Sequence, residues 1–399
     1  MEKTKVCWTE IACGATLRAC GKAGQHNTAR QLIDKMRKLG VTINGGSYLT
    51  LIQHCVRNKD STHAGDSRGG SEQALEWLQL MEDAGHVPNS RHFTAAVVIC
   101  SAEGNAVNAI KIFQRMRDQG EHASVQSWSA LLDAIGSAGQ VDQMMAMYRE
   151  MRASGQQPNL ITMNTMLARA GAAGEVGIAE GIWRELRDLK LVPDVMTYNP
   201  LINCYAMAKD PGKAEKVLAD MIKSAAVEPN AITFNSVMKA YIEVQRLDDA
   251  EDVISRMRAT GVQPDLEIWT SIIHAAGALG DIKRADRLYN DALLSGAVNP
   301  YRPWCTKHIR DASGNMQPKG TVMDLHGLNP TTACAAIRHE LRVRQKLEGA
   351  SRRKVPLYII TGQGGGHMRA DVADLLRSKK IHYQLPTGQS GRIVVPSSQ

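Results

Sequence analysis

The sequence has 399 residues, enough for two or three domains or for one long repeat array with an appended domain. Hydrophobic residues make up 43% of it, and no apolar run approaches the roughly 18 residues of a membrane span, so we expect no membrane partner. Residues 1–10 have neither a signal-peptide core nor the composition of a transit peptide. A repeat begins almost at once, so we expect a truncated or mature chain.

Charge is distributed unevenly along the chain. Residues 301–399 hold 16 Lys and Arg against 6 Asp and Glu, a net charge of +10. The first 300 residues hold 32 against 34, a net charge of −2, which together give the overall +8. The C-terminal part therefore has the electrostatic signature of a nucleic-acid partner. Binding by the longer N-terminal part has to come from locally placed groups.

The cysteine pattern argues against disulfides and zinc. Eight cysteines are present with irregular spacing and no CxxC pair, and Cys305 with His308 has no second ligand pair. Cys20, Cys55 and Cys100 share one position of a repeat on an apolar helix face. We expect them to be free thiols in the core.

Methionine and glycine recur at a fixed spacing from the N-terminus onward. Met81, Met116 and Met151 are 35 residues apart, and a glycine usually follows four residues later, where it can end a helix in the left-handed conformation. A Pro-Asn or Pro-Asp pair often closes the unit. After an N-terminal stub at 1–9, the spacing predicts eight units: 10–44, 45–89, 90–124, 125–159, 160–194, 195–230, 231–265 and 266–300.

Each unit has the pattern of two amphipathic helices, near 233–244 and 247–259 in the seventh unit. Units of fixed period stack so that neighbours bury each other's apolar faces. We therefore expect an all-α repeat solenoid built of helix-turn-helix units. The second unit is ten residues longer, and its polar, Gly-rich segment near 58–71 is expected to be a solvent loop.

The helix openings Val195–Asn199 (VMTYN) and Ala231–Asn235 (AITFN), the closing Pro-Asp and Pro-Asn pairs and the period of 35 resemble pentatricopeptide repeats. Tetratricopeptide repeats differ in period and signature. The resemblance implies a right-handed superhelical solenoid in which each repeat binds one base of single-stranded RNA. The fifth and the last residue of a repeat would reach the edge of the base, and the second residue would sandwich its face.

The resemblance also implies which base each repeat prefers. The pairs are Thr94 with Ser124 (a purine), Ser129 with Asn159 (A), Asn164 with Asp194 (U), Asn199 with Asn230 (a pyrimidine, C preferred), Asn235 with Asp265 (U) and Thr270 with Asn299 (A). The pairs of the first two repeats match no base, and Asn299-Pro300 reverses the usual order. Because the N-terminus of such an array faces the 5′ end of the RNA, the predicted core is 5′-AU(C/U)U-3′.

The second position of the repeat supports some of these pairs and weakens others. Apolar sandwich residues are expected in repeats five to seven, namely Ile161, Met196 and Ile232, whereas polar residues weaken three other repeats, namely Arg91, Gln126 and Glu267. A single Asn in such a place could instead be a helix cap or a turn residue. Three of them in one register, each with a matched last residue, favour base readout.

After residue 300 the period stops, and 301–320 are predicted to form a linker or half-helix. A strand ending in 322–328, a helix over 331–347, a strand at 356–360, a helix near 370–378 and a hairpin of 383–385 with 392–395 follow. That order predicts a small two-layer α/β domain over 321–399. The motifs Asp324–Gly327 (DLHG) and Thr361–Gly364 (TGQG) resemble the small MutS-related domain, with His367 where that family usually has Ser.

Members of that family either cleave or only bind nucleic acids, and both alternatives stay open. A nuclease would use Asp324 as metal ligand or base and His326 as acid or base, with Mg²⁺ or another divalent metal, whereas RNA binding by the repeats requires no cofactor. One acidic residue is few for metal-dependent cleavage, and the pair could instead tie the strand to its loop. RNA or DNA backbone contacts are expected from Gly362, Gly364, Gly365, Gly366, His367, Arg338 and Arg342.

Three classes of function therefore fit the sequence. The first is an RNA-binding factor for processing, stabilisation or translation of organellar transcripts, with other organellar RNA-processing proteins as further partners. The second is a site-specific RNA or DNA endonuclease, and the third is a protein-binding scaffold. The resemblance implies an organelle, for which we expect the plastid, with the mitochondrion as the alternative.

Overall fold

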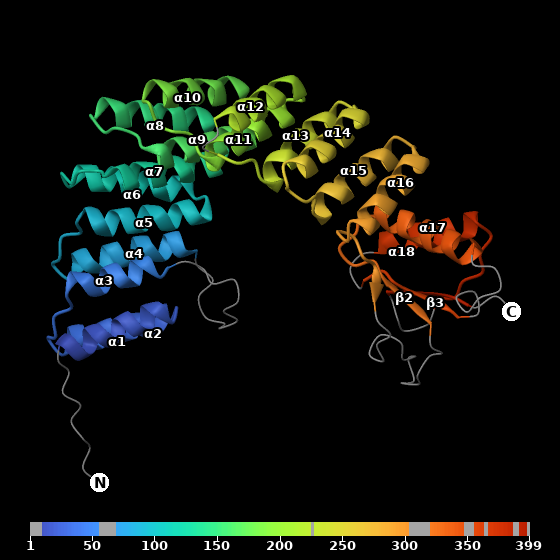
Figure 1. Cartoon of the computed structure of the whole chain (residues 1–399). Coiled ribbons are helices and arrows are strands. Elements are labelled where there is room, and N and C mark those ends of the chain that lie inside the picture. Colours follow the sequence, from blue (N-terminus) through green and yellow to red (C-terminus); the bar gives the residue numbers. More distant parts are fainter. Residues whose placement is uncertain are drawn as a thin grey trace, which may run out of the picture. The chain divides into compact units, whose positions relative to one another are not determined.

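The computed structural model describes residues 10–55, 69–224, 227–302, 320–346, 355–362, 366–385 and 391–396. The chain, shown in Figure 1, divides into two compact units, Met1–Ala208 and Lys209–Gln399. The insertion near 58–71 lies mostly outside the described residues. Only Gly70 and Ser71 of it are seen in a helix, where their backbone N–H groups donate to the carboxylate of Glu103. No described helix is long and apolar enough to cross a membrane.

The first unit is a stack of helix pairs, coloured blue to green in Figure 1. Its helices are α1 (Glu10–Lys22), α2 (His26–Lys38), α3 (Gly45–Gln53), α4 (Gly70–Asp83), α5 (Ser90–Glu103), α6 (Ala106–Asp118), α7 (Val125–Ser137), α8 (Val141–Ala153), α9 (Leu160–Ala173), α10 (Val176–Asp188) and α11 (Val195–Met207). The odd-numbered helices pack against one another, as α5, α7, α9 and α11 do, and α5, α7 and α9 also pack against α6, α8 and α10 respectively. The core therefore lies between the two layers of helices and continues from pair to pair.

The second unit starts with more helix pairs and ends in a small sheet. Its helices and strands are α12 (Pro211–Lys223), α13 (Ala231–Glu243), α14 (Leu247–Ala259), α15 (Leu266–Ala278), α16 (Ile282–Leu294), β1 (Tyr301–Arg302), β2 (Thr321–Asp324), α17 (Pro330–Lys346), β3 (Leu357–Ile360), α18 (Gly366–Ser378) and β4 (Arg392–Val395). The bounds of α14 are those expected from the sequence, and α13 begins two residues earlier than expected.

Helix starts and ends follow from local chemistry. Polar residues just before the odd-numbered helices from α3 to α15 accept a hydrogen bond from a backbone N–H of the first turn: Asn44, Asn89, Ser124, Asn159, Asp194, Asn230 and Asp265. Such a cap contributes about 1 kcal/mol. At the other end, Gly40 takes φ +70°, and Val41 N–H donates to the carbonyl of the buried Met36 over 3.0 Å. The methionine–glycine spacing is thus the signature of a helix end.

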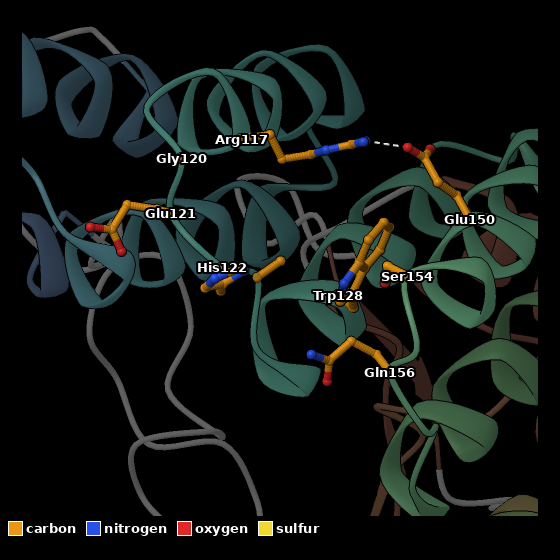
Figure 2. Close-up of a pocket in the computed structure, with 9 residues that line it drawn as sticks. Arg117, Gly120, Glu121, His122, Trp128, Glu150, Ser154 and Gln156 are labelled. Atoms are coloured by element: carbon orange, nitrogen blue, oxygen red, sulfur yellow. Dashed lines mark hydrogen bonds and ion pairs between the residues drawn. The ribbon is translucent and has the colours of Figure 1, made fainter.

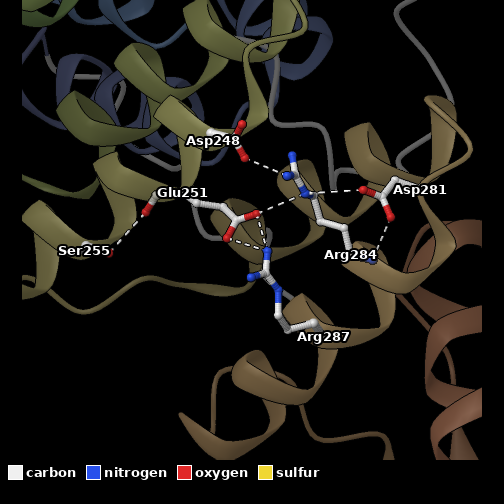
Figure 3. Close-up of polar contacts among 6 residues, drawn as sticks. All are labelled: Asp248, Glu251, Ser255, Asp281, Arg284 and Arg287. Atoms are coloured by element: carbon white, nitrogen blue, oxygen red, sulfur yellow. Dashed lines mark hydrogen bonds and ion pairs between the residues drawn. The ribbon is translucent and has the colours of Figure 1, made fainter.

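Even-numbered helices are joined to their neighbours by arginine–carboxylate ion pairs. Between α14 and α16, Arg287 Nη2 lies 2.7 Å from Glu251 Oε1 and Arg284 Nη2 lies 2.6 Å from Asp248 Oδ1 (Figure 3). In the first unit, Arg30 pairs with Glu76 in the same way over 2.5 Å. These pairs are partly exposed, so each contributes less than about 1 kcal/mol and they fix register more than stability.

The strand order in the sheet is β1-β2-β3-β4. β2 and β3 are parallel and are connected through α17, and the edge strands β1 and β4 are antiparallel to them. Two sequence expectations differ from this arrangement. Tyr301 and Arg302 form a strand on β2 although they fall in the predicted linker, and of the predicted strand 383–385 only a bridge from Gln384 to Val394 is present.

The expectation of free core thiols is confirmed for Cys20, Cys55 and Cys100, which are buried and form no disulfide. Burial raises the pKa of the Cys55 and Cys100 thiols to about 12. At neutral pH these groups are therefore protonated, and they behave as small apolar residues of the core.

Candidate nucleic-acid interface

Repeat five brings its two predicted reading residues into direct contact. Asn164 lies on α9 and Asp194 caps α11, and Asn164 Nδ2 donates to Asp194 Oδ1 over 3.0 Å. The Thr197 hydroxyl lies 2.7 Å from Asn164 Oδ1 and 2.8 Å from Asp194 Oδ1, so its single proton can be donated to either oxygen. The amide of Asn164 is therefore held with its nitrogen toward Asp194 and its oxygen toward Thr197.

The same arrangement occurs one repeat earlier with hydroxyl groups. Ser129 Oγ lies 2.7 Å from Thr162 Oγ1, which in turn donates to Asn159 Oδ1 over 3.0 Å. The third residue of the following repeat thus bridges the fifth and the last residue of the repeat before it. This bridging position was not predicted from the sequence, although it carries a visible signal, a Ser or Thr three residues after the cap.

The same hydroxyl contacts are found in repeat three, where the reading residues also line a cavity. Thr94 Oγ1 lies 2.6 Å from Ser127 Oγ, which lies 2.9 Å from Ser124 Oγ. Thr94 and Ser124 line a cavity of about 480 Å³ together with Arg91 and Gln126 from the second positions of repeats three and four. A cavity between two second-position side chains is where a sandwiched base would lie.

The predicted reading residues of repeat six belong to different units of the chain. Asn199 lies on α11, and Asn230 caps α13. Asn230 Oδ1 accepts hydrogen bonds from the backbone N–H and the hydroxyl of Thr233, both over 3.1 Å. Thr233 is fully buried, as Thr197 is.

Repeat seven departs from the others at the bridging position. The third residue of the next repeat is Ile268, which has no hydroxyl to bridge Asn235 and Asp265. Asn235 Nδ2 instead donates to Glu267 Oε1 over 3.0 Å, while Asp265 caps α15. Glu267 therefore draws Asn235 toward the second position.

The predicted sandwich residues project into solvent from the beginnings of their helices. The exposed fraction is 68% for Ile161, 66% for Met196 and 63% for Ile232. They share the second position of three successive repeats, so each repeat leaves an apolar side chain at this position open to solvent.

A second cavity lies away from these positions. It has a volume of about 290 Å³ and is lined by His122, Trp128 and Gln156 among others, with Arg117 and Glu150 facing each other at its edge (Figure 2). Trp128 is almost fully buried and packs against Phe113 with ring centroids 4.5 Å apart. The cavity contains no predicted reading residue and is lined by helix residues of α6, α7 and α8 together with the loops that follow α6 and α8.

In the small domain, Asp324 and His326 lie together at the carboxyl end of β2. Asp324 Oδ1 is hydrogen-bonded to His326 Nδ1 and accepts from the His326 backbone N–H over 3.1 Å, and Arg302 Nε lies 3.4 Å from Asp324 Oδ2. Burial raises the pKa of Asp324, but the hydrogen bonds from His326 and Arg302 outweigh it and leave the pKa below its usual value. Asp324 is thus a carboxylate that orients the exposed imidazole of His326.

The neighbouring glycine loop is only partly described. Gly364 and Gly365 lie outside the described residues, whereas Gly366 and the exposed His367 open α18. Gly362 has φ +84°, and a Cβ added there would lie 3.0 Å from the His326 ring. A glycine is therefore required for the loop to pass beside the imidazole.

The two predicted backbone-contacting arginines of α17 both face Asp286 on α16. Arg338 Nε lies 2.7 Å from Asp286 Oδ1, and both side chains are about seven-eighths buried. Arg342 Nη2 lies 3.2 Å from Asp286 Oδ2 and is half exposed. Arg338 thus holds α17 against α16, and only Arg342 retains a surface available to a phosphate.

The residues around Asp324 do not fit a divalent metal well. Both carboxylate oxygens are engaged, and one of their partners is the cationic Arg302. Among the described residues, no group of three His, Cys, Asp or Glu side chains converges as metal ligands. Metal-assisted cleavage usually uses more than one carboxylate, and the single carboxylate of Asp324 is already bonded to His326 and Arg302.

Family models match consecutive stretches of the chain. They are the pentacotripeptide-repeat region of PRORP at residues 7–147, the pentatricopeptide repeat domain at 146–207 and 226–281, the PPR repeat family at 193–241 and the PPR repeat at 267–296. No curated protein matches the chain.

The solved structures that match the chain are distant from it in sequence. The pentatricopeptide repeat protein PPR10 from maize is 17% identical, with a TM-score of 0.45, over 92% of this chain and 60% of that one. PPR10 in complex with an 18-nt psaJ RNA element is 19% identical, with a TM-score of 0.41, over 74% and 52%.

The PPR domain of Arabidopsis thaliana protein-only RNase P 1 in complex with tRNA is 20% identical, with a TM-score of 0.40, over 49% and 97%. The chain spans about half of the length of PPR10 in its RNA complex. Together with the stacked helix pairs and their shared caps, the family matches identify residues 7–296 as pentatricopeptide repeats.

Proposed function

We propose that the protein binds single-stranded RNA in a sequence-specific manner, one base per repeat, and acts in organellar RNA metabolism. Repeats four to seven read the core 5′-AU(C/U)U-3′. The observation that carries this proposal is the hydrogen bond between Asn164 and Asp194, which places the fifth and last residues of one repeat side by side. Two polar side chains fixed next to each other can present a defined donor and acceptor pattern to one base edge.

Three further features support base readout. The reading residues of repeats three to five are oriented by buried hydroxyl groups, so little ordering is left to do when RNA binds. Exposed apolar residues stand beside the reading pairs of repeats five to seven, where they can stack on bases. Pentatricopeptide repeats are moreover a fold that reads one base per repeat.

The experiment is a binding titration with short single-stranded RNAs that contain AUCU, against a scrambled control, at two salt concentrations. We expect tighter binding of the AUCU RNA and weaker binding of both RNAs at higher salt. The variant Asn235→Thr should change the preferred base at the fourth position from U to G. Equal, weak binding of both RNAs, unaffected by the substitution, would contradict base readout. The remaining class of function would then be a protein-binding scaffold.

A second candidate function is RNA or DNA cleavage by the small domain, which resembles the small MutS-related domain. The observation that favours it is the Asp324 carboxylate held against His326 beside Gly362, since a carboxylate-oriented imidazole is a common general acid or base. End-labelled AUCU RNA and a DNA of matching sequence, with and without Mg²⁺, test the idea. Cleavage lost in His326→Ala while binding persists supports an endonuclease, whereas intact RNA and DNA under all conditions leave a domain that only binds.

A further inference from the structure

The N-terminus of α17 repeats the geometry found at the start of the repeat helices. Asn329 precedes α17 and its Oδ1 accepts from the backbone N–H of Thr332 over 2.9 Å. Asp194 Oδ1 accepts from Thr197 N–H over the same distance at the start of α11. Thr332 is fully buried, like Thr197, and occupies the same third position of its helix. Cap, spacing and burial therefore coincide, although α17 belongs to the α/β domain.

α17 also occupies the place that the first helix of a ninth repeat would take. It packs against both α15 and α16, the two helices of the last repeat, just as α9 packs against α7 and α8. Asn329 Nδ2 donates to the carbonyl of Thr270, the fifth residue of repeat eight, over 2.9 Å. At the next turns, Thr331 contacts His274 over 3.3 Å, and Arg338 pairs with Asp286.

Asn299, in contrast, is used elsewhere. Its Oδ1 accepts a hydrogen bond from the backbone N–H of Tyr301 over 3.0 Å. Tyr301 is the first residue of β1, which pairs with β2. Within the described residues no hydrogen bond joins Asn299 to Thr270. Asn299, the reading partner that the sequence predicts for Thr270 near the end of repeat eight, is thus engaged at the start of the sheet. The residue next to Thr270 in space is Asn329, which comes 59 positions after it.

We propose that Asn329 completes the reading site of repeat eight, with Thr270 as its partner and an adenine of the RNA as its ligand. This inference rests on the proposed RNA-binding function and deepens it, because it makes the α/β domain a supplier of base specificity. The buried Thr332 hydroxyl has no hydrogen-bond partner among the described residues, and it stands where Thr162 and Thr197 bridge their reading pairs. Thr270, Asn329 and Thr332 thus stand at the fifth, last and third positions, as the polar residues of repeats four and five do. The contacts differ, because Asn329 bonds to the backbone carbonyl of Thr270, and the Thr270 hydroxyl donates to the carbonyl of Leu266 over 2.9 Å.

The test compares two single substitutions in the full chain. RNAs of the form AUCUN, with each base at N, are titrated against the wild type, Asn329→Asp and Asn299→Asp. The wild type should prefer A at N. Because Thr with Asp implies G in this family, Asn329→Asp should shift the preference at N from A to G by about tenfold, equivalent to about 1.4 kcal/mol. Asn299→Asp, the matched control, should keep A.

The outcomes separate this inference from the proposed function. Retained selection of AUCU over a scrambled core, with no change at N in Asn329→Asp, overturns the inference and leaves base readout by repeats four to seven intact. A shift to G in Asn299→Asp overturns it as well. Loss of core selection in the wild type instead refutes the proposed function. Aspartate is a good N-cap, so α17 should remain folded, and thermal unfolding of each variant checks this.

Discussion

Asn164 and Asp194 are thirty positions apart in the sequence and are joined by a hydrogen bond of 3.0 Å. Asp194 Oδ1 at the same time caps α11 and accepts from Thr197. One carboxylate oxygen therefore fixes the backbone of the next repeat and the amide of the previous one. In the proposed readout, the second oxygen of Asp194 and the second N–H of Asn164 are the groups that a base would use, and contacts within the protein already set their direction.

Asp194→Asn should change specificity at little cost in stability. Asparagine caps helices as well as aspartate does, as Asn230 does for α13. The substitution, however, replaces one of the two acceptor oxygens of the carboxylate with an NH2 donor. We expect the preference for U over C at the second core position to fall by about tenfold, which is about 1.4 kcal/mol. Asp210→Asn, at the cap of α12, is the control and should leave base preference unchanged. Binding titrations with AUCU and ACCU measure both; an unaltered ratio in Asp194→Asn would show that Asp194 is only a cap.

Thr197→Val should weaken both the fold and the specificity. Valine has nearly the same shape but removes the hydroxyl of the fully buried Thr197, which bridges the partly buried Asn164 and Asp194. An unsatisfied buried polar group costs about 1–3 kcal/mol, measured by chemical denaturation. The control is Thr16→Val, whose exposed hydroxyl bonds only to a carbonyl of its own helix. Equal unfolding free energies for both variants would contradict a bridging role.

Glu267→Ala should improve RNA binding. The Glu267 carboxylate accepts a hydrogen bond from the amide of Asn235 and would repel the phosphate backbone of a bound RNA. Its removal therefore frees the amide and lowers the repulsion. We expect affinity for AUCU to rise by about tenfold at low salt, with a sharper preference for U at the fourth position. Glu267→Gln separates the two causes, because it removes the charge and keeps an acceptor for Asn235. Unchanged affinity in Glu267→Ala would place Glu267 outside the RNA-binding surface.

Stability of the small domain should depend on Asp324 at acid pH. The pKa of Asp324 in the folded protein lies below its ordinary value of 3.8. The carboxylate therefore stabilises the fold above that ordinary value, and the contribution is lost as the pH falls through the folded pKa. The difference in unfolding free energy between wild type and Asp324→Asn should be largest above about pH 5 and shrink toward about pH 3. Denaturant titrations at several pH values, followed by a probe in the small domain, test this; a constant difference would contradict it.

Lys190→Gly should stabilise the first unit. Lys190 has φ +55° at the end of α10, where the other repeats often have glycine. A non-glycine residue in the left-handed region costs about 1–2 kcal/mol, of which glycine recovers roughly 1 kcal/mol after its larger chain entropy. Lys111→Gly, on the exposed face of α6, should instead destabilise by about 1 kcal/mol. Denaturant titrations should therefore show a higher unfolding free energy than wild type for Lys190→Gly and a lower one for Lys111→Gly.

The sequence predicted the repeat helices well because each start and end has its own local chemical signal. A polar cap precedes α13, and the methionine–glycine spacing marks the end of α14. Contacts between repeats carry no such signal. That Asn235 turns to Glu267 depends on the missing hydroxyl at Ile268, one position further on, and the period does not encode that choice.

The small domain was harder to anticipate for a different reason. Two-residue strands such as Tyr301–Arg302 are too short for any alternation and exist because β2 offers an edge. Its charge was also a poor guide to its surface. Arg338 is paired with Asp286 and Arg344 with Glu340, so part of the positive excess is internal. The composition gives the number of arginines, but it does not show which of them form ion pairs with carboxylates far away in the sequence, as Arg338 does with Asp286.

The packing of α17 on the last repeat has a practical consequence for shortened versions of the protein. A chain cut at Pro300 would leave the buried carboxylate of Asp286 without Arg338 and would uncover Tyr289, which is fully buried and packs against His339 with ring centroids 5.7 Å apart. A carboxylate stripped of its partner and an open apolar helix face favour aggregation. A minimal RNA-binding fragment that remains soluble therefore has to retain α17 and the sheet that supports it.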